Sequence, residues 1–220
     1  IDPNNRLLAL ESPRRLDAEF VRDNALAIAG LINLDLGGPS VFPYQPGGYY
    51  ANLQFPDRDY IADPNDREYR RGVYMHWQRT FLHPMLANFD APAREDCIAA
   101  RNVANTPQQA LTLLNDPTFV EAARVMATSV LAARCGSDAD RINLIYEKAL
   151  ARSAGEKERQ SLLDFLEKQR AYFQSEPSAT EQLLGVGNAP IPPDLNAPEL
   201  AAWAAVCRVV LDLHETITRY

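Results

Sequence analysis

Three aspartates, Asp17, Asp23 and Asp90, are the residues of this chain best suited to acid–base chemistry. A carboxylate in a concave pocket can act as a general acid or base when its surroundings shift its pKa. Asp17 and Asp23 lie in the first expected helix, whereas Asp90 opens a polar connector. An oxidative or hydrolytic enzyme would need these segments, about residues 15–23 and 90–109, to share one cleft. A scaffold would instead tie the same carboxylates to arginines.

The connector that begins at Asp90 is rich in side chains that bind anions or brace backbone. Arg94, Arg101, Asn105 and Gln109 lead into an expected helix N-terminus, which attracts negative charge. A ligand pocket is one interpretation of this segment. We prefer a hydrogen-bonded scaffold, because the buried backbone groups of an irregular connector need partners.

An irregular stretch, about residues 33–64, contains glycines and prolines that prevent a continuous helix. Long loops are usually functional or disordered, and the aromatic content here argues against disorder. We expect the rings to pack on the helical core, which is the commoner use of aromatic residues. In the alternative, Tyr44, Tyr49 and Tyr50 form a stacking platform for a ligand such as a sugar.

Metal and cofactor motifs are few. His76, His83 and Asp90 are evenly spaced and could hold a divalent metal, but Pro84 interrupts the element between them. We expect no metal here, because histidines beside aromatic residues are more often packing residues. We also expect no haem in this segment, because no C-x-x-C-H occurs. One disulfide is possible, and spacing does not choose among Cys97, Cys135 and Cys207.

The charge balance, 22 basic against 29 acidic residues, gives a net charge of −7. Such a balance disfavours binding to nucleic acid, whose phosphates attract basic surfaces. The sequence contains no apolar stretch of about 20 residues, so no transmembrane segment is expected. The chain starts at Ile1 rather than Met and resembles a piece cut from a longer protein.

Helical periodicity and capping residues predict a mainly α fold, a multi-helix orthogonal bundle forming one domain over residues 1–220. In Thr106-Pro107-Gln108-Gln109 a capping box opens one helix, and Asn115-Asp116-Pro117 ends it and caps the next. A Pro-rich link, residues 187–198, precedes the last helix. The expected helices are 12–30, 65–83, 106–115, 117–136, 138–150, 156–173, 179–184 and 197–220. For residues 65–83 a strand is the alternative, because Tyr, Val and Trp also suit strands.

Two helix faces carry alternatives. Arg15, Glu19, Arg22 and Asp23 share one face of the first helix. We expect a solvated row of ion pairs, since exposed pairs contribute little; the alternative is a partly buried ionic network that anchors the next segment. On the last helix, His214 lies on the apolar stripe and is expected to be a core histidine.

Longer motifs resemble a known family. The stretch 89–116, FDAPAREDCIAARNVANTPQQALTLLND, is similar to the C-terminal domain of unknown function in planctomycete cytochrome-c-domain proteins. Asp212 and Gln108 depart from that pattern, where Asn and Leu are commoner. Further matches are Arg15 to Glu19, Arg22-Asp23, Gly37-Gly38-Pro39 with Pro43, Tyr69-Arg70-Arg71, Trp203, Val206 and the closing LDLHETITR.

The resemblance implies the last part of a long exported protein, periplasmic or secreted, with haem c only in an upstream domain. No catalytic residue is established for such domains, so none is carried over. We therefore expect a non-haem helical module for interaction or substrate binding. Its partners would be other domains of the parent chain and an extracellular polysaccharide. The alternative is the enzyme described above.

Overall fold

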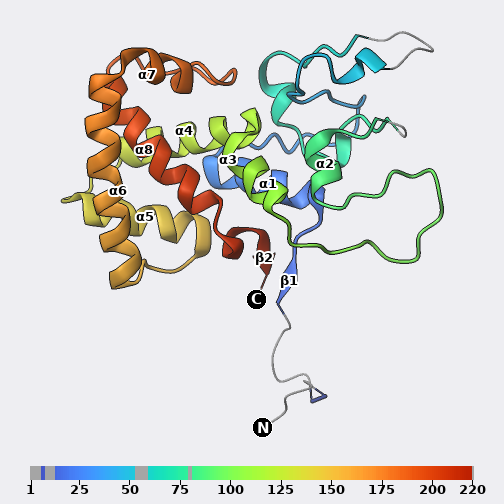
Figure 1. The fold of residues 1–220 in the computed structure, drawn as a ribbon, viewed down its shortest axis with the longest axis horizontal. Coiled ribbons are helices and arrows are strands. Elements are labelled where there is room, and N and C mark those ends of the chain that lie inside the picture. Colours follow the sequence, from blue (N-terminus) through green and yellow to red (C-terminus); the bar gives the residue numbers. More distant parts are fainter. Residues whose placement is uncertain (1–5, 8–12, 53–58, 79–80, 220) are drawn as a thin grey trace.

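The computed structural model describes residues 6–7, 13–52, 59–78 and 81–219 (Figure 1). This part is mainly helical, which confirms the predicted class, and its only paired strands are β1 (Arg14–Arg15) and β2 (Thr218–Arg219). The α-helices are α1 (Ala18–Ala29), α2 (Pro84–Asn88), α3 (Pro107–Asn115), α4 (Pro117–Ala132), α5 (Asp138–Leu150), α6 (Glu156–Ser175), α7 (Pro177–Leu184) and α8 (Ala197–Leu211). Among the described residues, four 3₁₀ turns complete the regular structure: η1 (Tyr49–Asn52), η2 (Asn65–Tyr69), η3 (Gly72–Tyr74) and η4 (His214–Ile217).

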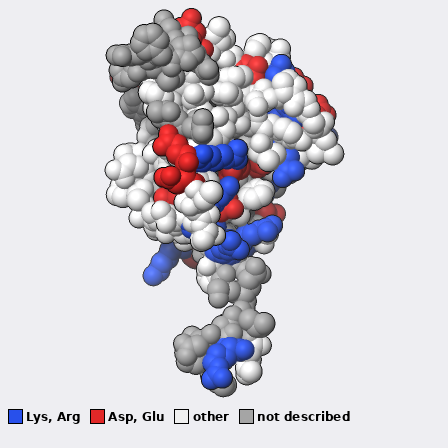
Figure 2. Space-filling model, turned by 90° about the vertical axis from the view of Figure 1, so that its right-hand side faces the viewer, with Lys and Arg blue, Asp and Glu red and all other residues white. Residues whose placement is uncertain are grey.

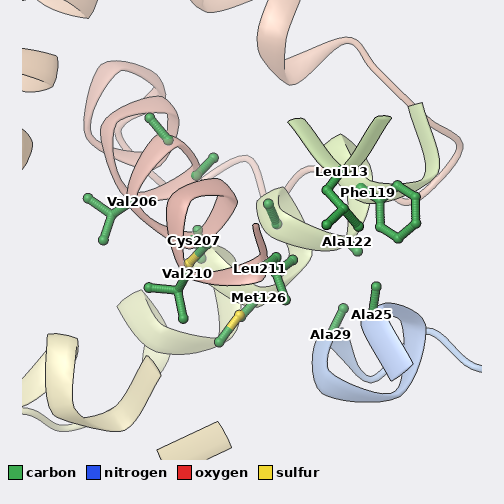
Figure 3. Packing of buried hydrophobic residues seen from close by; sticks show 14 of the residues in the cluster. Ala25, Ala29, Leu113, Phe119, Ala122, Met126, Val206, Cys207, Val210 and Leu211 are labelled. Carbon is green, nitrogen blue, oxygen red and sulfur yellow. The ribbon is translucent and has the colours of Figure 1, made fainter. Parts of the chain in front are cut away.

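Helix α8 forms the centre of the hydrophobic core. Every residue from Leu200 to Cys207 is buried, as expected for a helix that is apolar on all sides. It packs against α4 and α6 and also contacts α3, α5 and α7. Figure 3 shows side chains of α1, α3 and α4 in the same cluster, including Phe119 and Met126.

The predicted capping signals act where the sequence places them. Gly30 ends α1 in the left-handed conformation with φ 76°. Gln109 accepts a 3.4 Å hydrogen bond from the Thr106 N–H, and Pro107 occupies the first turn of α3. Asp116 then accepts from the Thr118 N–H at 2.9 Å and caps α4. These boundaries are confirmed because caps satisfy backbone groups locally.

The helix predicted for residues 65–83 is wrong. The described residues there form only the turns η2 and η3. Carbonyl groups that a helix would use internally accept bonds from elsewhere: Tyr69 O from the Asn33 N–H and Tyr74 O from the Val41 N–H, both at 2.9 Å. These contacts form two isolated parallel β-bridges, one between Asn33 and Arg70 and one between Val41 and Met75. Long-range hydrogen bonds therefore override helical periodicity in this segment.

Both chain ends also differ from prediction. The first helix begins at Ala18, because Arg14 and Arg15 pair with β2, and Ser12 lies outside the described residues. The last helix stops at Leu211, because the Thr216 hydroxyl donates to the Val210 carbonyl at 2.9 Å and the chain turns toward β1. His214 is consequently exposed rather than a core residue.

The irregular loop predicted for about residues 33–64 is confirmed over its described part, and its rings form an aromatic cluster. Tyr50 packs edge-on against Tyr60 and Phe81, with ring centroids 5.3 and 6.0 Å apart. Phe42 stacks on His76 at 4.6 Å. Figure 1 shows this segment beside α1 and α2, on the opposite side of the molecule from α6.

Candidate functional site

Arg22 of α1 is completely buried and anchors the segment that follows the aromatic loop. Its guanidinium donates to the Arg70 carbonyl at 2.7 Å and also to the Glu68 carbonyl. The Glu68 carboxylate, equally buried, lies 3.8 Å away. Asp23 accepts from the Gly72 N–H at 2.6 Å. The predicted solvated row is therefore wrong for these two residues, because tertiary contacts bury them as an ionic network.

A second buried group joins the loop, α4 and the Pro-rich link. Glu121 of α4 accepts from the Tyr69 hydroxyl at 2.9 Å, the Tyr44 hydroxyl at 3.2 Å and the Ala189 N–H at 2.6 Å. Arg124 lies 3.4 Å from Glu121 and donates to the Ala189 carbonyl at 2.8 Å. Because Tyr44, Tyr69 and Ala189 all lie outside α4, this group braces the fold.

The buried carboxyl of Glu68 predicts a pH dependence of stability. Burial raises its pKa to about 8 from an ordinary 4.5, although Arg22 opposes the shift. Folding therefore binds a proton between these values, so the stabilisation is complete below pH 4.5 and is lost as the pH rises to about 8. We expect Glu68→Gln, measured by urea unfolding, to gain stability relative to the unsubstituted chain between about pH 5 and about pH 8.5.

Glu156→Gln is the matched control, because the Glu156 side chain is 77% exposed. Its stability should follow the same pH curve as the unsubstituted chain. Parallel curves for Glu68→Gln and the unsubstituted chain would show that Glu68 does not change protonation on folding.

An open cavity of about 750 Å³ lies between α1, the end of α5 and the C-terminal turn η4. Phe20, Asp23, Asn24 and Ala27 form its α1 wall, at the i, i+3, i+4 and i+7 positions of one stripe. Phe20 is 48% exposed there. The remaining lining residues are Leu16, Ile32, Arg71, Lys148, Ala149, Leu150, Ala151, Glu215, Thr216, Thr218 and Arg219.

Hydrogen bonds hold the polar walls of this cavity. The Asn24 amide donates to the Thr216 carbonyl at 2.8 Å, which fixes η4 against α1. Asp23 also lies 3.4 Å from the Arg71 guanidinium. Burial raises the pKa of Asp23, and its hydrogen bonds to Gly72 and Arg71 oppose that shift. The cavity thus presents a partly apolar floor with fixed polar groups at its edge.

The predicted connector residues lie outside this cavity. Asp90 accepts from Arg15 at 2.7 Å and from the Ala104 N–H at 2.9 Å, and Gln109 donates to the Asn88 carbonyl at 2.9 Å. Arg101 donates two hydrogen bonds to the Glu19 carboxylate, at 2.6 and 3.0 Å, and lies 3.9 Å from Asp17. The Arg94 guanidinium lies 3.8 Å from the centre of the Trp77 ring, and Asn105 is exposed. The three aspartates are therefore not brought together.

The surface around the connector carries charges of both signs. Figure 2 looks onto the right-hand side of Figure 1, and acidic and basic side chains lie next to one another across that face. Four arginines lie close together in the sequence here: Arg67, Arg70, Arg71 and Arg79. Arg70 is buried and donates to the Asp35 and Pro39 carbonyls, both at 3.1 Å. Arg79 lies outside the described residues. Arg70 therefore serves as an internal brace, whereas Arg67 remains exposed.

The tyrosines of the alternative ligand platform and the two candidate histidines make internal contacts. The Tyr49 hydroxyl donates to the Leu82 carbonyl at 2.9 Å, and Tyr50 is buried. His83 is buried, with Nε2 2.6 Å from the Tyr44 carbonyl. His76 lies 3.4 Å from Gln78. Within the described ranges, no three His, Cys, Asp or Glu side chains are arranged to hold a metal ion.

Sequence reasoning missed most of the cavity residues. In the sequence, Phe20 and Ala27 belong to the apolar side of α1, which is expected to be buried. Only the polar residues Asp23 and Asn24 between them indicate that this stripe of the helix is open to solvent. Glu215 and Arg219 lie almost 200 positions further along the chain, where no local signal relates them to α1. Tertiary packing alone brings these residues together.

Two walls of the cavity lie in a stretch of the chain that matches a known protein family. A family model described as PSD1, protein of unknown function (DUF1553), matches residues 1–166, which include the α1 and α5 walls of the cavity. No curated protein and no solved structure shows a significant match. No helix in the described part is both long and apolar enough to cross a membrane. The chain belongs to the PSD1 family, domains of unknown function found at the C-terminal end of larger planctomycete cytochrome-c-domain proteins.

Proposed function

We propose that this chain is a non-haem binding module of an exported multidomain protein and that it holds an extracellular saccharide in the cavity between α1 and α5. The observation that carries the proposal is the half-exposed ring of Phe20 on the wall of an open cavity. Sugar rings present an apolar face that packs on aromatic rings, and their hydroxyls need polar partners. A volume of about 750 Å³ lies within the range of small-ligand sites.

The polar partners come from both sides of the cavity. The last carbonyls of α5, around Lys148 to Leu150, have no intrahelical donors, as at any helix C-terminus, and can accept hydroxyl protons. Asn24 and Thr218 add side-chain groups. This combination of one ring and several acceptors suits a short stretch of polysaccharide better than a wholly apolar ligand.

Replacing Phe20 with alanine tests the proposal. We expect isothermal titration with neutral and acidic oligosaccharides of two to four units to show about tenfold weaker binding, because the stacking surface is lost. Leu111→Ala is the control, since Leu111 on α3 is 58% exposed and lies outside the cavity. Equal affinity of Phe20→Ala and the unsubstituted chain, or no binding by any of these sugars, would contradict the proposal.

A hydrolytic enzyme is the second candidate, and it rests on two carboxylates, Asp23 and Glu215, in the cavity wall. Glycoside hydrolysis uses a carboxylate pair. However, Glu215 makes two hydrogen bonds of 2.9 Å with Arg152, which favours a positioning role. Release of reducing ends from a bound oligosaccharide, lost in Asp23→Asn with affinity retained, would favour the enzyme over the binding module.

A further inference from the structure

The charged groups of the cavity are unevenly satisfied. Its two carboxylates are both hydrogen-bonded to arginines, Asp23 to Arg71 and Glu215 to Arg152. Lys148 and Arg219 also line the cavity, and no hydrogen bond or ion pair involves either side chain within the described residues. These two cations therefore remain available on a concave wall.

Many arginines of this chain are paired with carboxylates. Its net charge is −7, and arginines elsewhere form close pairs: Arg101 with Glu19, Arg152 with Glu158 and Arg170 with Glu199. Because each of the two cavity carboxylates is paired with an arginine, Lys148 and Arg219 leave a local positive potential in the cavity. Low-dielectric walls concentrate such a potential.

The strand pair adds a second, independent observation. Arg219 of β2 lies directly opposite Arg14 of β1, and directly opposed residues project on the same face of a sheet. Two like charges in this arrangement oppose strand pairing. The side chain of Arg219 thus contributes nothing to the pairing of β1 with β2, and Arg14 strengthens the positive potential beside the cavity.

We propose that the ligand of this cavity carries an anionic oxygen group, a carboxylate or a sulfate, which Lys148 and Arg219 bind while Phe20 packs on the sugar ring. The proposal rests on the saccharide-binding function above and narrows its ligand to an acidic saccharide. Guanidinium and ammonium groups form short, charge-assisted hydrogen bonds with such oxygens. Asn24 and the α5 carbonyls then serve the neutral hydroxyls of the same sugar.

A structural role for Lys148 must be separated from ligand binding. Lys148 lies in the last turn of α5, where a positive charge interacts favourably with the helix dipole. That role would change the melting temperature and leave ligand affinity unaltered. Both quantities are therefore measured for every variant.

The experiment uses the intact chain and matched ligands. Trigalacturonate is titrated beside its methyl ester, which keeps the sugar and removes the charge, and a sulfated oligosaccharide is titrated beside its desulfated form. The variants are Lys148→Gln and Arg219→Gln, with Lys168→Gln as control, because Lys168 is an exposed α6 lysine outside the cavity. We expect each cavity variant to bind the acidic ligand about tenfold more weakly, with unchanged affinity for the neutral form.

Tighter binding of either charged ligand than its neutral form, weakened by added salt and by both cavity variants, supports the proposal and identifies the anionic group. If charged and neutral ligands bind equally and Phe20→Ala weakens both, the acidic-ligand proposal fails and saccharide binding stands. If no ligand binds, both proposals fail. If Lys168→Gln weakens binding as much as the cavity variants, the proposed site is wrong.

Discussion

Replacing Arg22 with methionine is expected to lower the free energy of unfolding by about 3–5 kcal/mol, because two buried carbonyl groups lose their donor and each unsatisfied buried acceptor costs about 1–3 kcal/mol. Arg22 donates to the Glu68 and Arg70 carbonyls, and the Glu68 carboxylate is 3.8 Å away in a site closed to solvent. Methionine has similar length but no donor. Urea unfolding near neutral pH measures the loss, with the slope of the transition confirming that the same surface is exposed.

Arg67→Met is the matched control for this prediction. The Arg67 side chain is 46% exposed and lies 3.9 Å from Asp63, so the same substitution should change stability by less than about 1 kcal/mol. The double variant Arg22→Met, Glu68→Gln should recover little of the loss near neutral pH, because burial raises the pKa of Glu68 to about 8 and its carboxyl is mostly uncharged there. A loss for Arg22→Met no larger than that of Arg67→Met would show that the network does not anchor residues 68–72.

Replacing Gly187 with alanine is expected to cost about 3–5 kcal/mol, which is the range for disrupting a buried ionic group. Gly187 has φ 92°, and a Cβ atom at this position would overlap the Glu121 carboxylate. The carboxylate would have to leave the buried Tyr69 hydroxyl and the half-buried Ala189 N–H, and both would lose their acceptor. Thermal unfolding followed by circular dichroism provides the measurement.

Gly30→Ala separates backbone strain from this overlap. Gly30 has φ 76°, similar to Gly187, but no atom lies within 4 Å of the added Cβ. The expected cost is therefore about 1–2 kcal/mol, which is the left-handed penalty alone. Equal destabilisation by the two substitutions would mean that Glu121 moves aside freely and does not lock the Pro-rich link to α4.

Local signals predicted much of the helical part correctly. Asp116, Pro117 and Gly30 define helix ends through backbone groups within a few residues, so their effect does not depend on the rest of the fold. The apolar character of α8 similarly marks a buried helix. Such features are determined by neighbours in the sequence, which is why sequence patterns suffice to find them.

The segment 65–78 shows where local signals fail. Its spacing of aromatic and branched residues is compatible with a helix, yet Asn33, Val41 and Arg22 take the carbonyl groups on which that helix would depend. The same contacts bury Arg22 and Asp23, which sequence reasoning places on a solvated face. The conformation of this segment therefore depends on hydrogen-bond partners 33 to 48 residues away in the sequence.

By itself, the sequence determined the mainly helical class, several helix ends and the irregular aromatic loop, and its motifs pointed to the family. Tertiary structure alone decided which charges are buried and where a ligand can enter, because Phe20, Lys148 and Arg219 become neighbours only when α1, α5 and the C-terminal turn pack together. Capping depends on interactions within one turn of helix, whereas a cavity depends on surfaces that the chain brings together from distant positions.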